Sequence, residues 1–181
     1  MQQSSKTALG AMTAALSVVI MLLTVVPVLT YTSPAFAGLL LVIIVIELDK
    51  KWAFGVYAAV GVLSVLLASD KEAAIIYLFF FGYYPILKAI IESKLKSILG
   101  WIAKFALFNT AIVACYLMIV KVLLLPMEDF DDFGKYTIPI LLLAGNVVFF
   151  LYDMLLTKVV VIYAVKWQQK FRKLFSFKKR K

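Results

Sequence analysis

Six long apolar stretches, separated by short polar segments, occupy most of the chain. They span residues 8–29, 34–46, 52–68, 73–91, 98–125 and 137–165. A helix needs about 20 apolar residues to cross roughly 30 Å of hydrocarbon, and all but the second stretch approach or exceed that length. The pattern predicts an all-α polytopic membrane protein. Its six transmembrane helices form one bundle over residues 1–165, followed by a tail over residues 166–181.

The composition agrees with this class of protein. Hydrophobic residues make up 64% of the chain and charged residues 16%, whereas a soluble domain is about half apolar and roughly a quarter charged. A water-soluble globule is therefore excluded. The first apolar stretch is about twice as long as the apolar core of a secretory signal peptide. We expect it to be retained as a membrane helix, although Ala35-Phe36-Ala37 resembles a cleavage site.

The charge is unevenly placed along the chain. Lys and Arg number 19 against 10 Asp and Glu, and eight of the cations lie between Lys166 and Lys181. With the N-terminus inside, 16 of the 19 cations fall in inner segments, and six of the ten acids fall in outer loops, chiefly the acidic loop 126–136. Inner loops of membrane proteins are enriched in Lys and Arg. The chain is therefore predicted to be a multi-pass protein of the cell membrane with both termini in the cytoplasm.

The tail 166–181 interleaves its cations with Trp167, Phe171, Phe175 and Phe177. Aromatic rings enter the membrane interface while Lys and Arg contact anionic headgroups, each cation contributing about 1 kcal/mol. We expect this basic aromatic tail to bind anionic lipids. Nucleic acid is not an expected partner, because its binding needs a basic face on a folded domain.

Small residues recur near the start of the first apolar stretch. Gly10 and Ala14 form one pair spaced by four, and Ala11 and Ala15 form a second. Residues four apart share a helix face, and small side chains allow another helix to approach closely. The four residues are a candidate partner interface, and ordinary packing within the chain is the alternative.

Asp153 is the one acid deep inside a predicted span. A carboxylate within the membrane is costly and is a functional candidate by default. Lys88, Lys104 or Lys158 lies at a depth that allows it to neutralise Asp153. The two interpretations are a buried Asp–Lys tether and a contact for a ligand or a coupling ion.

The fourth, fifth and sixth spans carry polar side chains that are able to converge on one pocket. Pro85 lacks an N–H group and should kink the fourth span next to two tyrosines. Small-molecule sites are mainly apolar with a few hydrogen-bonding groups. Alternatively, these groups only join helices to one another. The candidate substrate-binding residues are Tyr83, Tyr84, Asn109, Tyr116 and Asn146.

No catalytic machinery, cofactor or metal site is expected. The chain has no histidine, and its one cysteine, Cys115, lies in an apolar run. Histidine-based nucleophilic systems and metal sites are therefore excluded, and the sequence contains no phosphate-binding P-loop. Asp153 lacks the second carboxylate that an aspartic mechanism requires. An ATP-driven process would need ATPase subunits from outside the chain.

The short basic start, the repeat Ala11-x-x-x-Ala15 and six spans in under 200 residues resemble the substrate-binding (S) component of energy-coupling factor transporters. The resemblance implies a subunit that captures a vitamin-like small molecule from outside. It also implies docking on a transmembrane coupling protein joined to two ATPase subunits, through Ala11 and Ala15. The substrate would lie beneath the first outer loop, among the fourth to sixth spans.

A non-catalytic membrane scaffold or assembly protein with a lipid-binding tail is the alternative function. The two hypotheses differ in the volume between the fourth, fifth and sixth spans. A capture subunit should have a cavity there, whereas a scaffold should fill that volume with side chains. A self-sufficient channel or carrier is less favoured, because the sequence shows no inverted repeat.

Overall fold

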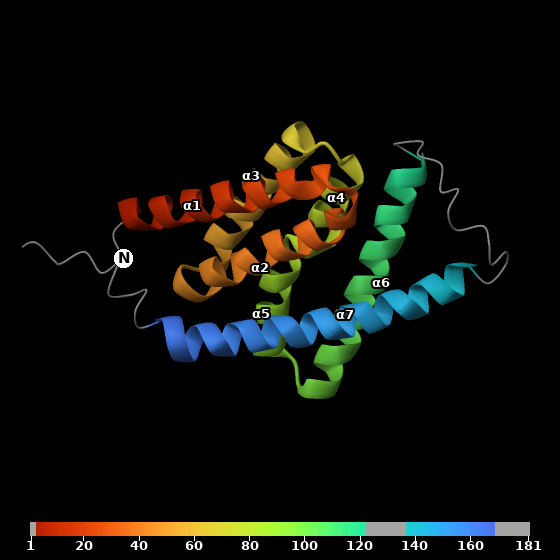
Figure 1. Ribbon diagram of the computed structural model, residues 1–181. Helices are drawn as coiled ribbons and strands as arrows, with labels where there is room; N and C mark the ends of the chain where they lie inside the picture. Colours follow the sequence, from red (N-terminus) through yellow and green to blue (C-terminus); the bar gives the residue numbers. More distant parts are fainter. Residues whose placement is uncertain (1–2, 122–136, 169–181) are drawn as a thin grey trace, which may run out of the picture.

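The computed structural model describes residues 3–121 and 137–168, and within these ranges every regular element is helical. The acidic loop 126–136 and most of the tail lie outside them. The seven α-helices are α1 (Gln3–Leu22), α2 (Thr32–Glu47), α3 (Lys50–Leu67), α4 (Lys71–Ile76), α5 (Tyr84–Lys94), α6 (Ser97–Lys121) and α7 (Thr137–Ile162), shown in Figure 1. Two π-helical turns, η3 (Tyr77–Phe81) and η5 (Tyr163–Trp167), follow α4 and α7. The expectation of an all-α bundle is confirmed.

Within residues 3–121 and 137–168, five helical segments are long and apolar enough to cross a membrane, which makes this a multi-pass membrane protein. They are Gln3–Val25, Lys50–Leu67, Lys71–Lys94, Ser97–Ile119 and Leu142–Trp167. The segment Lys71–Lys94 corresponds to the fourth apolar stretch of the sequence and is called the fourth span below. It combines α4, η3 and α5 into one interrupted span. The remaining helix, α2, has 16 residues and is about 24 Å long. It is therefore shorter than the roughly 30 Å hydrocarbon core.

The short helix α2 lies at the centre of the bundle. It contacts α1, α3, α5 and α7, and Phe36 is the one exposed residue in the stretch 33–48. A helix that is apolar on every side is typical of such a buried position. Gly38 allows α2 to approach the fourth span so closely that a Cβ atom at this position would collide with the Phe81 carbonyl oxygen.

The polar segments between the apolar runs end one helix and begin the next. The Asp49 carboxylate accepts a hydrogen bond from the Trp52 N–H at 3.0 Å and caps α3. The Asp70 carboxylate accepts from the N–H groups of Glu72 and Ala73 and caps α4. Such caps satisfy N–H groups that have no partner within the helix.

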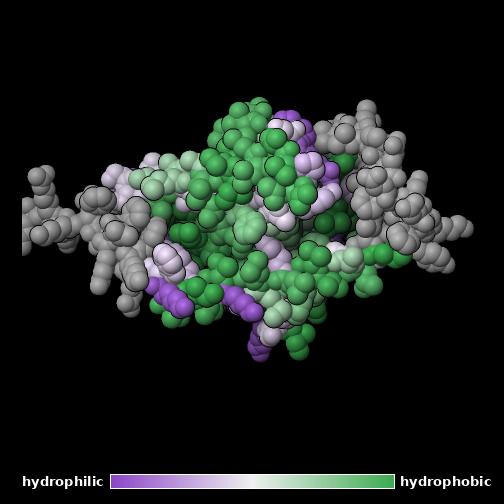
Figure 2. Space-filling view, in the orientation of Figure 1, coloured by the Kyte–Doolittle hydropathy of each residue, from purple (hydrophilic) through white to green (hydrophobic). Residues whose placement is uncertain are grey.

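The outer surface of the bundle is largely apolar. Figure 2 shows hydrophobic side chains over most of the visible face, with hydrophilic residues toward its edges. Exposed large apolar side chains are found on α1, α3, α6 and α7. In water such a surface would drive aggregation, whereas in a bilayer it is the surface that contacts lipid.

Candidate functional site

The fourth span is interrupted near its middle by the π-helical turn η3. The Gly82 N–H donates to the Tyr77 carbonyl at 2.8 Å, five residues back rather than four. The Leu78 carbonyl, which Gly82 would bond in an α-helix, instead accepts a hydrogen bond from the Tyr57 hydroxyl of α3 at 2.8 Å. π-Helical turns often occur at functional sites. The kink expected at Pro85 is thus accompanied by a change of hydrogen-bond register four to eight residues earlier.

A groove of about 470 Å³ lies beside this turn, between α3, η3 and α6. Ligand pockets usually enclose about 300–1,000 Å³. The rings of Tyr57 and Tyr83 meet edge to face within it, with centroids 6.0 Å apart. None of the eight described lining residues is charged: Tyr57, Leu78, Phe79, Tyr83, Leu107, Thr110, Ala111 and Ala114.

Of the five candidate substrate-binding residues, Tyr83 alone is among the described residues that line this groove. Tyr84, the next residue, is buried, and its hydroxyl donates to Asp153 at 2.6 Å. The Tyr116 side chain is 45% exposed on α6. The structure therefore separates the two adjacent tyrosines into different environments.

Asn109 of α6 and Asn146 of α7 bond to each other. Each side-chain amide N–H₂ donates to the partner's amide oxygen at 3.1 Å. Each N–H₂ also donates to the carbonyl four residues earlier, that of Phe105 or Leu142. The two side chains thus satisfy each other and join α6 to α7.

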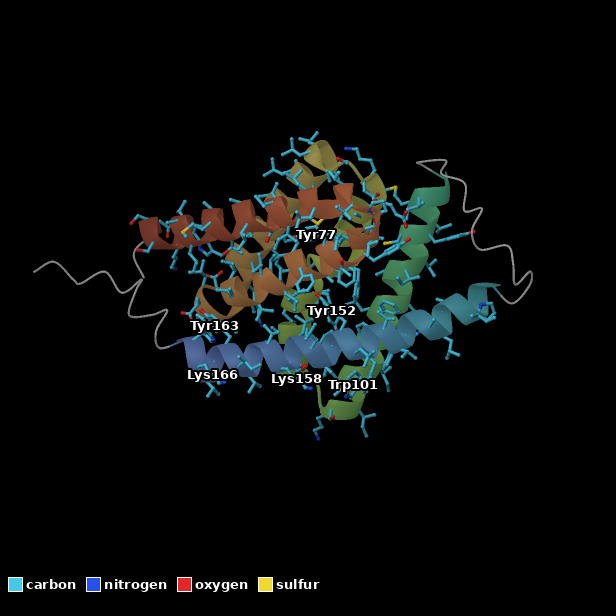
Figure 3. All side chains as sticks on the ribbon, in the orientation of Figure 1. Tyr77, Trp101, Tyr152, Lys158, Tyr163 and Lys166 are labelled. Atoms are coloured by element: carbon cyan, nitrogen blue, oxygen red, sulfur yellow. The ribbon has the colours of Figure 1, made fainter. Side chains whose placement is uncertain are left out.

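Aromatic side chains fill the volume between η3, α5, α6 and α7. The rings of Phe108 and Phe149 stack with centroids 4.7 Å apart, and Phe80 meets Phe108 edge to face at 5.1 Å. Tyr152 closes the cluster from α7, and its ring points into the interior (Figure 3). The described groove therefore lies between the third, fourth and fifth spans, not among the fourth to sixth spans where a pocket was expected.

Lys88, Glu92, Lys104 and Asp153 form a largely buried charge network. Two of its members, Lys88 and Glu92, lie in α5, the helix that follows the π-helical turn η3. The Lys88 ammonium lies 2.6 Å from Asp153 and 2.7 Å from Glu92. The Lys104 ammonium lies 3.1 Å from Asp153 and 2.6 Å from Glu92. Asp153 is 2% exposed and Lys88 4%, whereas the Glu92 side chain is 48% exposed. Two cations and two anions make the network neutral.

Two further contacts hold this network. The Tyr84 hydroxyl shares the Asp153 Oδ1 atom with Lys88. Trp101 stacks beneath Lys104, whose ammonium lies 4.8 Å from the ring centroid, a cation–π geometry. Of the three lysines considered from the sequence, Lys88 and Lys104 pair with Asp153, and Lys158 lies on the exposed side of α7 (Figure 3). The network ties α5, α6 and α7 together.

The small residues of α1 divide between two faces. Gly10 is buried, and a Cβ atom there would lie 3.4 Å from Val56 and 3.7 Å from Trp52 of α3. Ala14 is half-buried, while Ala11 and Ala15 are exposed. Gly10 and Ala14 therefore pack within the chain, whereas Ala11 and Ala15 lie on the exposed face of α1.

Fold and composition define the class: an all-α, multi-pass membrane protein. No protein-family model, curated protein or solved structure matches the chain.

Tyr57 and Thr110, the two polar residues that line the groove together with Tyr83, were not singled out from the sequence. Tyr57 lies three residues after Phe54 in an apolar run, and no polar pattern distinguishes it. The available signal for this part of the chain was the segment Gly82-Tyr83-Tyr84-Pro85, in which Pro85 predicted a kink close to the groove residue Tyr83.

Proposed function

We propose that the protein is a non-catalytic, membrane-embedded substrate-capture subunit of an importer for a vitamin-like micronutrient. In this proposal it docks on a separate transmembrane coupling protein with two ATPase subunits, as the S components of energy-coupling factor transporters do. The observation that carries the proposal is the uncharged groove of about 470 Å³ beside an interrupted membrane span. Interrupted helices at mid-membrane depth form the substrate sites of many transporters.

The proposed orientation places the groove at a suitable depth. With both termini in the cytoplasm, α6 runs outward, and the groove residues Leu107 to Ala114 extend from its middle toward the outer surface. The first turn of α1, the α2–α3 turn and the last turn of α7 lie on one side of the molecule (Figure 1). This arrangement supports a common inner side for these segments.

The orientation can be tested on Lys94, the last residue of α5. Its side chain is exposed, and it lies two residues after Glu92 of the charge network. We expect a membrane-impermeant amine reagent, added to intact cells, to leave Lys94 unmodified and to modify it after permeabilisation. Peptide mass spectrometry measures both states. Modification of Lys94 in intact cells would place this turn outside and reverse the proposed topology.

The proposed docking surface is the exposed face of α1 around Ala11 and Ala15. We expect Ala11→Trp and Ala15→Trp each to abolish copurification of a coupling protein and ATPase subunits from native membranes, because the bulky ring prevents close helix approach. Ala59→Trp, at an exposed position of α3, is the matched control and should leave copurification unchanged. Equal recovery of partners with all three variants would remove α1 as the docking surface.

The alternative, a membrane scaffold with a lipid-binding tail, has one observation in its favour. The aromatic cluster of Phe80, Phe108, Phe149 and Tyr152 fills the volume between the fourth, fifth and sixth spans, as that hypothesis required. A scaffold needs no ligand. Native purification followed by mass spectrometry separates the two, because a capture subunit should copurify with a small molecule and with ATPase subunits.

A further inference from the structure

The chemistry of the groove restricts what it accepts. Its described lining offers no charge to balance a charged ligand, and burying an unpaired charge is prohibitively costly. Two of its three hydroxyl groups are already engaged: Tyr57 donates to the Leu78 carbonyl, and Thr110 donates to the Ala106 carbonyl at 2.8 Å. The Tyr83 hydroxyl makes no hydrogen bond to any residue that the structure describes.

Apolar side chains next to groove residues are exposed on the surface of the bundle. Phe54 on α3 is exposed and contacts the Tyr57 ring edge to face, with centroids 6.4 Å apart. Val113 and Leu117 on α6 are exposed on the same helix face as Thr110. These side chains form part of the exposed apolar surface that contacts lipid in a bilayer.

We infer that the groove binds an uncharged, largely apolar small molecule that enters sideways from the bilayer and forms one hydrogen bond to the Tyr83 hydroxyl. This inference rests on the groove of the proposed function and names its class of substrate. The Tyr83 hydroxyl, which has no hydrogen-bond partner among the described residues, distinguishes this ligand from a lipid acyl chain, which offers no hydrogen-bonding atom. The uncharged lining distinguishes it from an ionised solute.

Three matched probes test the inference on the full chain in lipid nanodiscs: 2-naphthol, 2-methylnaphthalene and 2-naphthoate. They share the ring system and carry a hydroxyl group, a methyl group and a charge, respectively. Binding of the tritiated compounds is measured by scintillation proximity and corrected for empty nanodiscs. We expect 2-naphthol to bind most tightly and 2-naphthoate not to bind.

Variants locate the binding. Ala114→Phe fills the groove and should abolish 2-naphthol binding, whereas Ala106→Phe, at an exposed position of the same helix, should preserve it. Tyr83→Phe keeps the ring and removes the hydroxyl. We expect it to weaken 2-naphthol binding about tenfold, the effect of one hydrogen bond, and to leave 2-methylnaphthalene binding unchanged.

Each contrary result has a defined meaning. Equal binding of 2-naphthol and 2-methylnaphthalene, with no effect of Tyr83→Phe, would identify an acyl-chain groove and overturn the inference. Preference for 2-naphthoate, or no saturable binding at all, would overturn it as well. The measurement needs no coupling protein, so failed docking with intact 2-naphthol binding would remove the importer proposal alone. Docking without 2-naphthol binding would remove this inference alone.

Discussion

Replacing Asp153 with asparagine is expected to lower the free energy of unfolding by about 3–5 kcal/mol. The substitution keeps the shape of the side chain but leaves two lysines, both 4% exposed, opposite one half-exposed carboxylate. Removing one partner of a buried ion pair is costly because the remaining charge has been taken out of solvent without compensation. Titration with sodium dodecyl sulfate in mixed micelles, followed by circular dichroism, measures the change.

Two companion variants identify the cause. Glu92→Gln removes the other anion of the network, but its side chain is 48% exposed, so water screens the loss and we expect a cost of about 1 kcal/mol or less. The double variant Asp153→Leu, Lys88→Met leaves Lys104 paired with Glu92 and restores neutrality. It should be more stable than Asp153→Asn. Equal stability of Asp153→Asn and Glu92→Gln would show that burial does not set the cost.

Replacing Gly38 with alanine is expected to destabilise the protein by about 1–3 kcal/mol, the range for overpacking. The new methyl group would overlap the Phe81 carbonyl oxygen and lie 3.1 Å from the Tyr152 hydroxyl. Because the collision is with main chain, α2 must move away from η3 rather than let a side chain rotate. The same unfolding titration measures the loss.

Gly55 provides the matched control for Gly38. It lies within α3, and nothing lies within 4 Å of a Cβ atom added there. Gly55→Ala should therefore be neutral or stabilise by up to about 1 kcal/mol, because alanine is the better helix former. If the two glycine variants were equally stable, the close approach of α2 to η3 would not limit packing.

Hydropathy was sufficient to predict the bundle, because crossing a bilayer forces every backbone group into intrahelical hydrogen bonds. The polar segments around Asp49 and Asp70 also identified helix boundaries, since both carboxylates cap the helices that follow. The central position of α2 did not follow from the sequence. A helix that is apolar all round fits either lipid or protein, and tertiary contacts decide between them.

The site was less accessible from the sequence than the fold. Depth along α7 was enough to restrict the partners of Asp153 to three lysines, of which Lys88 and Lys104 are the ones used. Spacing placed Asn109 and Asn146 on helix faces, but it does not show that the two amides face each other. The π-helical turn η3 was missed because Pro85 indicates only that its own backbone N–H donor is absent. The change of hydrogen-bond register in η3 instead involves the Tyr57 hydroxyl of another helix, which donates to the Leu78 carbonyl.

The neutrality of the charge network has an electrical consequence. Moving one elementary charge across a membrane potential of 100 mV involves about 2.3 kcal/mol. Lys88, Lys104, Asp153 and Glu92 sum to zero, so a voltage does no net work on these four charges when α5, α6 and α7 shift together along the membrane normal. The network therefore adds no voltage dependence to such a displacement, whereas Asp153→Asn would leave it with one net positive charge on which the field acts.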